Sequence, residues 1–159
     1  MYAIDSASVL YKDKAWLFSG HSGAGKSTHT NMWKELFNTP VINGDLNLID
    51  INTTDGIPVV IGIPWCGTSG IYTSRSYPLG GITFIKKDIT DQVRRIDGDD
   101  AVLSIAQRMI SPCWNTRLLE NNLAASEKIA AGITVFRLCC TKNPSSAFLM
   151  KEEIDNEYH

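Results

Sequence analysis

Short apolar runs separated by polar turns dominate the first half of the chain. Ser6 to Tyr11 and Ala15 to Ser19 are two such runs, and the polar residues 12–14 join them. This pattern predicts a β-hairpin. Residues 26 to about 37 instead repeat their apolar side chains at helical spacing, which predicts a helix after the second strand.

The chain returns to β-structure after that helix. Val41-Ile42-Asn43 is a short apolar run, and Leu46 to Asn52 and Pro58 to Ile63 flank the turn signal Thr53-Thr54-Asp55-Gly56. A further strand is expected at Gly81 to Lys86. An antiparallel hairpin among these strands implies a mixed sheet instead of a purely parallel one.

The second half of the chain is mainly helical. A helix is expected from Ala101, with Asp99 as its N-cap, and a longer helix should end near Ala131. A last strand is expected from Ile133 to Cys139, followed by a terminal helix that Pro144 opens. The charged residues Asp91 to Arg95 are interpreted as a solvated face.

Together these elements predict one α/β domain over residues 1–159, with a mixed, β-rich sheet flanked by helices. The first strand begins close to the N-terminus of the sequence, which is compatible with this being the C-terminal part of a longer natural protein.

A glycine-rich stretch lies between the second predicted strand and the first predicted helix. Its residues 20–27 match the phosphate-loop pattern G-x-x-x-x-G-K-[ST] at every fixed position. The predicted nucleotide-binding residues are Gly20, His21, Ser22, Gly23, Ala24, Gly25, Lys26, Ser27 and Thr28.

The chemistry of phosphate binding requires this spacing. Glycines let the backbone turn its N–H groups inward as a nest for phosphate oxygens, and the helix that follows adds its positive N-terminal end. Lys26 then reaches the β- and γ-phosphates, and the Ser27 hydroxyl binds Mg²⁺. The alternative is an ordinary glycine-rich turn with a solvated Lys26. The strand before the loop and the helix after it favour a nucleoside triphosphate, with ATP as the first candidate.

Asp45 is the second candidate for the site. It follows the short strand 41–43, which comes directly after the predicted phosphate-loop helix. A carboxylate at the end of such a strand binds Mg²⁺ or orients the attacking group in phosphoryl transfer. We therefore predict Lys26 and Asp45 as catalytic residues, and Ser27 and Asp45 as metal ligands. The alternative for Asp45 is a Gly-Asp turn whose carboxylate accepts backbone N–H groups.

These motifs resemble the kinase core shared by HPr kinase/phosphorylase and ATP-dependent phosphoenolpyruvate carboxykinase. The resemblance rests on residues 20–28, on the short strand that ends in Gly44-Asp45 and on the β-rich segment after it. The segments Gly62 to Gly67 (Gly-Ile-Pro-Trp-Cys-Gly) and Pro78 to Ile82 resemble an uncharacterised bacterial branch of HPr-kinase-like proteins. The match covers residues 6 to about 150. It implies that the loop holds the triphosphate and that strand-end aspartates bind metal and assist transfer.

The chain departs from this family at two points. Relatives usually place two adjacent aspartates at the strand end, whereas Gly44 and Leu46 flank Asp45 here. Either Asp45 alone then binds the metal and assists phosphoryl transfer, or another residue supplies the catalytic base. A match to the C-terminal signature by which HPr kinases dock HPr is also missing, which argues against HPr as the acceptor.

The segment from Pro64 to Pro78 is rich in Gly, Ser and Thr and also carries Trp65 and Arg75. It is interpreted either as a loop that recognises the phosphoryl acceptor, with Arg75 stabilising the transferred charge, or as a surface loop with a solvated arginine. Trp65 is expected to pack in the core.

Composition and charge limit the partners and the cellular location that the sequence predicts. The formal net charge of −2 gives no electrostatic case for nucleic acid as a partner, and neither a membrane-spanning run nor a signal peptide is recognisable. The four cysteines form no C-x-x-C pair, which disfavours a zinc site and fits reduced thiols in the cytoplasm. A homo-oligomer remains compatible with the sequence.

The sequence therefore predicts an ATP- and Mg²⁺-dependent phosphotransferase. Its acceptor is a protein, a peptide or a small molecule, and a seryl hydroxyl is expected by analogy alone. Two alternatives remain open. The first is a non-catalytic nucleotide-binding module, which the missing second aspartate favours. The second is a metabolite kinase of the shikimate type, against which the β-rich segment after Asp45 argues.

Overall fold

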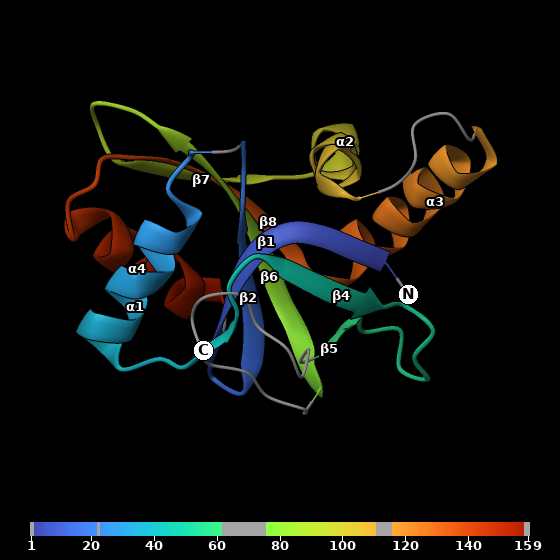
Figure 1. The fold of residues 1–159 in the computed structure, drawn as a ribbon, viewed down its shortest axis with the longest axis horizontal. Helices are drawn as coiled ribbons and strands as arrows, with labels where there is room; N and C mark the ends of the chain where they lie inside the picture. The colour runs from blue at the N-terminus through green and yellow to red at the C-terminus, as the bar shows by residue number, and fades with distance from the viewer. Residues whose placement is uncertain (1, 22, 62–75, 111–115, 158–159) are drawn as a thin grey trace.

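A computed structural model describes residues 2–21, 23–61, 76–110 and 116–157 (Figure 1). Within these residues the chain forms eight strands and four helices. In chain order they are β1 (Tyr2–Tyr11), β2 (Lys14–Ser19), α1 (Lys26–Phe37), β3 (Val41–Asn43), β4 (Leu46–Asp50), β5 (Val59–Ile61), β6 (Ser76–Lys87), β7 (Gln92–Ile96), α2 (Gly98–Arg108), α3 (Thr116–Gly132), β8 (Thr134–Cys140) and α4 (Ser145–Glu157).

The long strands β1 and β6 change partners along their length. Residues 2–5 of β1 pair with β4, whereas residues 6–11 pair with β2. In the same way, residues 76–78 of β6 pair with β5, and its later residues pair with β2 and β8. The two strands therefore join a small antiparallel part of the sheet (β1–β4–β5–β6) to a larger mixed part that contains β2, β8 and β7.

Three neighbouring strands of the larger part run parallel, because β6 pairs in parallel with both β2 and β8. The carboxyl ends of parallel strands meet at one edge of a sheet, and ligands of open α/β sheets bind at that edge. The glycine loop (residues 20–25) follows β2 there, Lys87 ends β6, and Thr141 follows β8.

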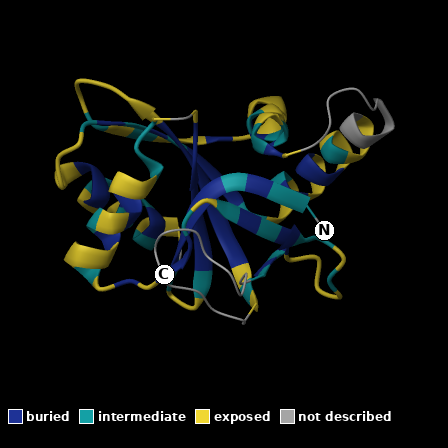
Figure 2. Cartoon of the chain, in the orientation of Figure 1, coloured by how far each residue is buried: buried dark blue, intermediate teal, exposed yellow. Residues whose placement is uncertain are grey.

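Helices cover both faces of this sheet (Figure 1). The helices α1 and α4 lie on one face, and α2 and α3 lie on the other. Side chains of a strand alternate between the faces, so Trp16 and Phe18 of β2 belong to the same buried cluster as Trp33 of α1, whereas Leu17 belongs to the cluster that contains Ile105 of α2. Figure 2 shows the central strands as the buried interior between these two helical layers.

The predicted helix from Lys26 and the predicted strand Val41–Asn43 are confirmed with the same bounds. The strands β1 and β6 begin at Tyr2 and Ser76, earlier than predicted. Their first residues pair with β4 and β5, and the hydrophobic pattern of the sequence does not indicate this change of partner. No described helix is both long and apolar enough to cross a membrane.

One prediction in the second half is confirmed and one is wrong. The charged side chains of Arg94 and Arg95 are exposed, as expected of a solvated face, and they lie on the edge strand β7, whose backbone pairs with β8. The N-cap of α2 is Asp97 instead of Asp99, and the Asp97 carbonyl accepts a hydrogen bond from the Ala101 N–H. The predictions for residues 62–75, which include Trp65, Arg75 and the segment Gly62 to Gly67, lie outside the described residues.

Candidate functional site

The glycine loop takes backbone conformations that suit glycine. Gly23 and Gly25 have φ angles of +80° and +99°, in the region that residues with a side chain rarely adopt. Gly20 is needed for a different reason, since a Cβ atom there would lie 2.7 Å from the carbonyl oxygen of Ile85. The loop therefore packs directly against the end of β6 and keeps a turn that larger residues would disturb.

Helix α1 begins directly at the end of this loop. Gly25 is its N-cap residue and has no side chain with which to cap the first-turn N–H groups. The Ala24 N–H donates to the His21 carbonyl, and the His29 N–H donates to the Gly25 carbonyl. The first-turn N–H groups and the helix dipole together make this end of α1 electropositive.

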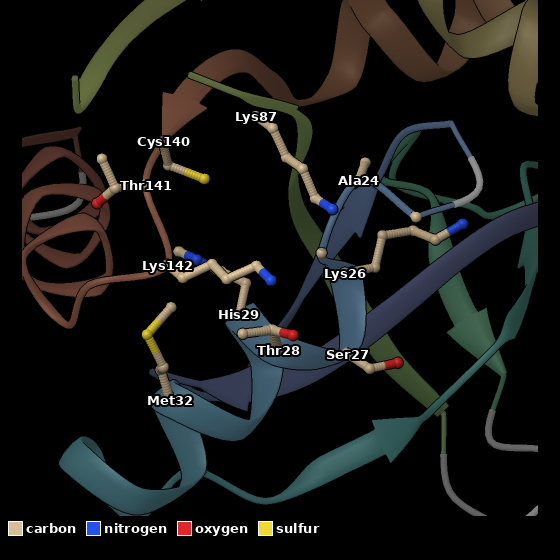
Figure 3. A pocket seen from close by; sticks show the side chains of 12 residues that line it. Ala24, Lys26, Ser27, Thr28, His29, Met32, Lys87, Cys140, Thr141 and Lys142 are labelled. Carbon is tan, nitrogen blue, oxygen red and sulfur yellow. The ribbon is translucent and has the colours of Figure 1, made fainter. Parts of the chain in front are cut away.

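Lys26 turns toward strand β1 (Figure 3). Its Nζ lies 3.0 Å from Oδ1 of Asp5 and 3.4 Å from the carbonyl oxygen of Gly20. The Lys26 side chain is only 18% exposed, whereas that of Asp5 is 44% exposed. The ammonium group is therefore held beside the start of the glycine loop by a carboxylate that solvent and ligands can reach.

Asp45 lies on the other side of β1, in the turn between β3 and β4. Its side chain is exposed, and its carbonyl oxygen accepts a hydrogen bond of 3.1 Å from the Ser6 N–H. Because Ser6 follows Asp5 in β1, the two acidic residues are tied to adjacent positions of one strand. This turn therefore fixes the backbone of Asp45 against β1, beside the position of Asp5.

A buried polar network holds the Asp45 turn. Asn47 accepts hydrogen bonds from the Ser8 hydroxyl and from the Asn43 side-chain amide, and it donates to both the carbonyl and the hydroxyl of Ser6. Ser6, Ser8, Asn43 and Asn47 are all buried. Buried amides bonded in this way fix the relative positions of β1, β3 and β4, and with them the turn that carries Asp45.

A pocket of about 270 Å³ lies along the N-terminal half of α1, and we call it the α1 pocket (Figure 3). It is bounded by the glycine loop, by α1, by the end of β6 and by the segment after β8. Its lining residues are Gly23, Ala24, Gly25, Lys26, Ser27, Thr28, His29, Met32, Lys87, Cys140, Thr141 and Lys142.

His29 is a buried donor in the wall of the α1 pocket. The Trp33 Nε1–H donates to its Nε2 at 3.0 Å, and since an indole can only donate, the proton of the neutral imidazole is on Nδ1. This Nδ1 has no hydrogen-bond partner among the described residues. Burial lowers the pKa of His29 to about 4, against a smaller opposite effect of Asp91, so the ring is neutral at physiological pH.

Cys140 lines the same pocket as a thiol. Burial, and then the negative charges of Asp91 and Cys139, raise its pKa to about 11. A thiol with this pKa is protonated near neutral pH and is a poor nucleophile. The charged side chains of the α1 pocket are therefore its lysines, of which Lys87 and Lys142 project around the cavity in Figure 3.

A larger pocket of about 500 Å³ lies at the opposite face of the sheet, beside α2, and we call it the α2 pocket. It shares Gly23, Ala24 and Lys87 with the α1 pocket. Its lining residues are Gly20, His21, Gly23, Ala24, Phe84, Ile85, Lys86, Lys87, Ser104, Gln107, Arg108 and Arg137. The glycine loop thus separates two pockets at the carboxyl edge of the parallel strands.

Most of the predicted site residues come together around the glycine loop. Gly20, His21 and the residues from Gly23 to Thr28 line one or both pockets, whereas Ser22 lies outside the described residues. Asp45 lines neither pocket and is linked to the loop only through β1. Among the described residues, no three His, Cys, Asp or Glu side chains are grouped as a ready-made metal site.

Sequence reasoning missed several residues of the site. Asp5 contacts Lys26 from a strand that precedes the motif, and Lys87, Arg137 and Lys142 reach the pockets from distant segments. No local motif marks these residues, because only strand pairing brings them to the loop. His29 did carry a signal, since it lies three residues after Lys26 on the same helix.

The fold is similar to that of a known kinase. It resembles the structure of the HPr(Ser) kinase/phosphatase from Coxiella burnetii, with a TM-score of 0.52 and 9% sequence identity. The matched region covers 98% of the present chain and 95% of the Coxiella burnetii chain. At this identity the likeness concerns the fold and carries no residue roles. No protein-family model matches the chain, and no curated protein matches it.

Proposed function

We propose that this protein is an ATP- and Mg²⁺-dependent phosphotransferase, a kinase whose fold resembles that of HPr(Ser) kinase/phosphatase. The observation that carries the proposal is the glycine loop, with its positive φ angles, joined to the uncapped start of α1 and followed at once by Lys26. Backbone N–H groups, a helix N-terminus and a lysine are the groups that bind the phosphates of a nucleotide.

The nucleotide would extend from this loop into the α1 pocket. Its β- and γ-phosphates would meet the loop amides and Lys26, and the sugar and base would lie along α1. The pocket volume of about 270 Å³ is sufficient for part of a nucleotide, and the neutral ring of His29 forms part of its wall. Lys87 and Lys142 add positive charge near the phosphates.

The donor set near the loop suits Mg²⁺. The Ser27 hydroxyl and the Asp45 carboxylate are exposed oxygen donors, which is the ligand type that Mg²⁺ prefers. We assign these two residues as metal ligands, and the metal would neutralise charge that develops on the transferred phosphoryl group. Asp45 could alternatively accept the proton of the acceptor hydroxyl. Asp5 is a second carboxylate beside Lys26, in place of the adjacent aspartate that the family usually has.

The first prediction concerns Lys26. Lys26→Ala should lower the affinity for Mg²⁺·ATP by at least roughly tenfold, because a charge-assisted contact to phosphate is lost. Isothermal titration calorimetry on the full chain measures this affinity. Lys34→Ala, at an exposed position of the same helix, is the matched control. An unchanged affinity in Lys26→Ala would overturn the proposed function.

Asp45→Asn tests the metal assignment in the same assay. ATP affinity should lose its dependence on Mg²⁺ while the affinity without Mg²⁺ stays close to that of the wild type. Asp13→Asn, in the exposed β1–β2 turn, removes the same charge away from the site.

A non-catalytic nucleotide-binding module is the second candidate. The observation that favours it is the single aspartate at the β3–β4 turn, flanked by Gly44 and Leu46. Such a module would bind ATP but would not transfer its phosphoryl group, whichever acceptor is added with Mg²⁺. A shikimate-type kinase is disfavoured, because strands β4 and β5 follow Asp45 in place of substrate-covering helices.

The acceptor and the cellular setting extend the same proposal. The kinase/phosphatase from Coxiella burnetii is named for a seryl group of HPr, so a seryl hydroxyl is one candidate acceptor here, and a small molecule is the other. We also propose a cytoplasmic location, where ATP is available and where the free thiols of Cys139 and Cys140 stay reduced. Neither nucleic acid nor a membrane is proposed as a partner, and assembly as a homo-oligomer remains a prediction.

A further inference from the structure

The α2 pocket collects positive charge without acidic partners. Lys86, Lys87, Arg108 and Arg137 line it, and its lining contains no Asp or Glu. In the part of the chain that the structure describes, none of these four side chains takes part in an ion pair. Four like charges around one cavity repel one another unless an anion lies between them.

Strand register adds to this concentration of charge. Arg137 of β8 lies opposite Phe84 of β6 and opposite Arg94 of β7. Lys86 follows two residues after Phe84 and therefore projects from the same face of the sheet. Like charges directly opposite each other in a sheet are destabilising, so the Arg94–Arg137 pair carries a cost that a bound anion would relieve.

The pocket also contacts the glycine loop directly. Arg108 donates a hydrogen bond of 3.3 Å to the carbonyl oxygen of Gly20, the same atom that Lys26 Nζ approaches. Gly20, His21, Gly23 and Ala24 form one wall of the pocket. A molecule bound there lies beside the loop, on the opposite face of the sheet from the α1 pocket.

We propose that the α2 pocket binds the phosphoryl acceptor, and that this acceptor is a small hydroxyl-bearing organic anion with a carboxylate or phosphate group. This inference rests on the proposed function and specifies its substrate class. The volume of about 500 Å³ lies in the usual range for small-molecule sites. The arginines pair with the anionic group, because guanidinium matches carboxylate and phosphate geometry.

The transfer itself balances without further reactants. The acceptor hydroxyl oxygen forms a bond to the γ-phosphorus, and the bond from that phosphorus to the β–γ bridging oxygen breaks. ADP leaves with the electron pair of the broken bond. The hydroxyl proton passes to water, because the lining of the α2 pocket contains no Asp or Glu.

The test is calorimetry on the full chain with saturating ADP and Mg²⁺, repeated without nucleotide. The probes are malate, citrate and 3-phosphoglycerate, each at millimolar concentration. We expect at least one probe to bind, and Arg137→Gln to weaken that binding by roughly tenfold or more, as for the loss of a charged hydrogen bond. ADP affinity should not change. Lys128→Gln, on the exposed side of α3, is the charge-matched control.

Several outcomes would overturn the inference. If ADP binds the wild type but none of the three probes does, the acceptor site is not here and the proposed function still stands. If Arg137→Gln weakens ADP binding by the same factor, the pocket binds the phosphates of the nucleotide instead of an acceptor. Binding of a polyglutamate peptide without binding of the small anions would indicate a protein acceptor. Failure of ADP to bind would overturn the proposed function and, with it, the role of this pocket as a phosphoryl-acceptor site, whereas the titration without nucleotide decides separately whether the pocket binds anions.

Discussion

His29 combines three properties at one residue: its ring is 1% exposed, its tautomer is set by Trp33, and it lines a pocket beside the glycine loop. Its ring also packs on Phe18, with centroids 4.7 Å apart. A neutral imidazole in this environment can donate from Nδ1 but cannot gain a proton without first overcoming the cost of burying a charge.

The pKa of His29 predicts how stability depends on pH. The folded-state pKa of about 4 lies below the unfolded value of 6.5, so between these values the unfolded chain binds the extra proton. Stability from this group is therefore complete above pH 6.5 and is lost as the pH falls toward 4, by about 3 kcal/mol. Urea unfolding of the wild type and of His29→Gln across this range measures the difference. Equal pH dependence in both proteins would contradict the assignment.

Asp5 gives a prediction about nucleotide binding. A triphosphate that recruits Lys26 must displace the Asp5 carboxylate, and it is also repelled by that charge. Asp5→Asn should therefore raise the affinity for ATP without Mg²⁺ by about two- to fivefold, the value of a partly exposed ion pair. Calorimetry in the presence of a chelator measures this change, with Asp13→Asn as the control. A weaker affinity would mean that Asp5 positions Lys26 for the phosphates.

At the scale of single residues, the sequence predicted the parts of the site that are continuous in the chain. Residues 20–28 could be assigned because one motif contains all of them. Asp5 and Arg137 could not be, because each lies on a strand whose neighbours are set by pairing across the sheet. The roles of Lys26, Ser27 and Asp45 in binding remain predictions for the experiments above.

Among the secondary-structure elements, the junction of β1, β3 and β4 depends on polar contacts more than on apolar packing. Asn47 has no exposed surface, and it makes four hydrogen bonds within this junction. Removing a partner from such a network leaves other buried groups unsatisfied. The position of the turn with Asp45 therefore depends on these hydrogen bonds.

Asn47→Ala should lower the free energy of unfolding by about 1–3 kcal/mol, because Ser8 and Asn43 lose a buried partner. Urea denaturation monitored by circular dichroism measures the loss. Asn52→Ala, at an exposed position after β4, is the matched control. If the two variants lose equal stability, the network does not support the junction.

Helices and strands that depend on local sequence were predicted accurately, whereas strands that depend on distant pairing were not. Helix α1 was predicted with its full bounds because apolar spacing and the motif coincide. The first residues of β1 were missed because they pair with β4, a contact between segments distant in the sequence. The residues of β7 were predicted only as a solvated face, because charged side chains give no strand pattern, and pairing with β8 makes them a strand.

For the whole molecule, two hydrophobic clusters lie on opposite faces of one sheet. One contains Ile105 of α2, and the other contains Met150 of α4, and both residues are fully buried. The strands between them contribute alternate side chains to each cluster, so neither cluster can form without the sheet. This arrangement predicts one cooperative unfolding transition.

Ile105→Ala and Met150→Ala test that prediction from the two sides. Each should lower the free energy of unfolding by about 2–5 kcal/mol, as other large-to-small core substitutions do, and each should keep a single transition. Scanning calorimetry shows the number of transitions directly. Ile89→Ala, at a side chain that is 91% exposed, should change little. A second transition in either core variant would mean that the two faces unfold separately.

The position of β2 has a consequence for amide hydrogen exchange. This strand is paired on both sides, with β1 and β6, and it leads directly into the glycine loop. Amides of such a central strand exchange only through the largest openings of a protein, those close to global unfolding. The loop is therefore anchored to the last part of the molecule to open. Local fluctuations at the edge strand β7 leave its geometry intact, and the site persists for as long as the fold does.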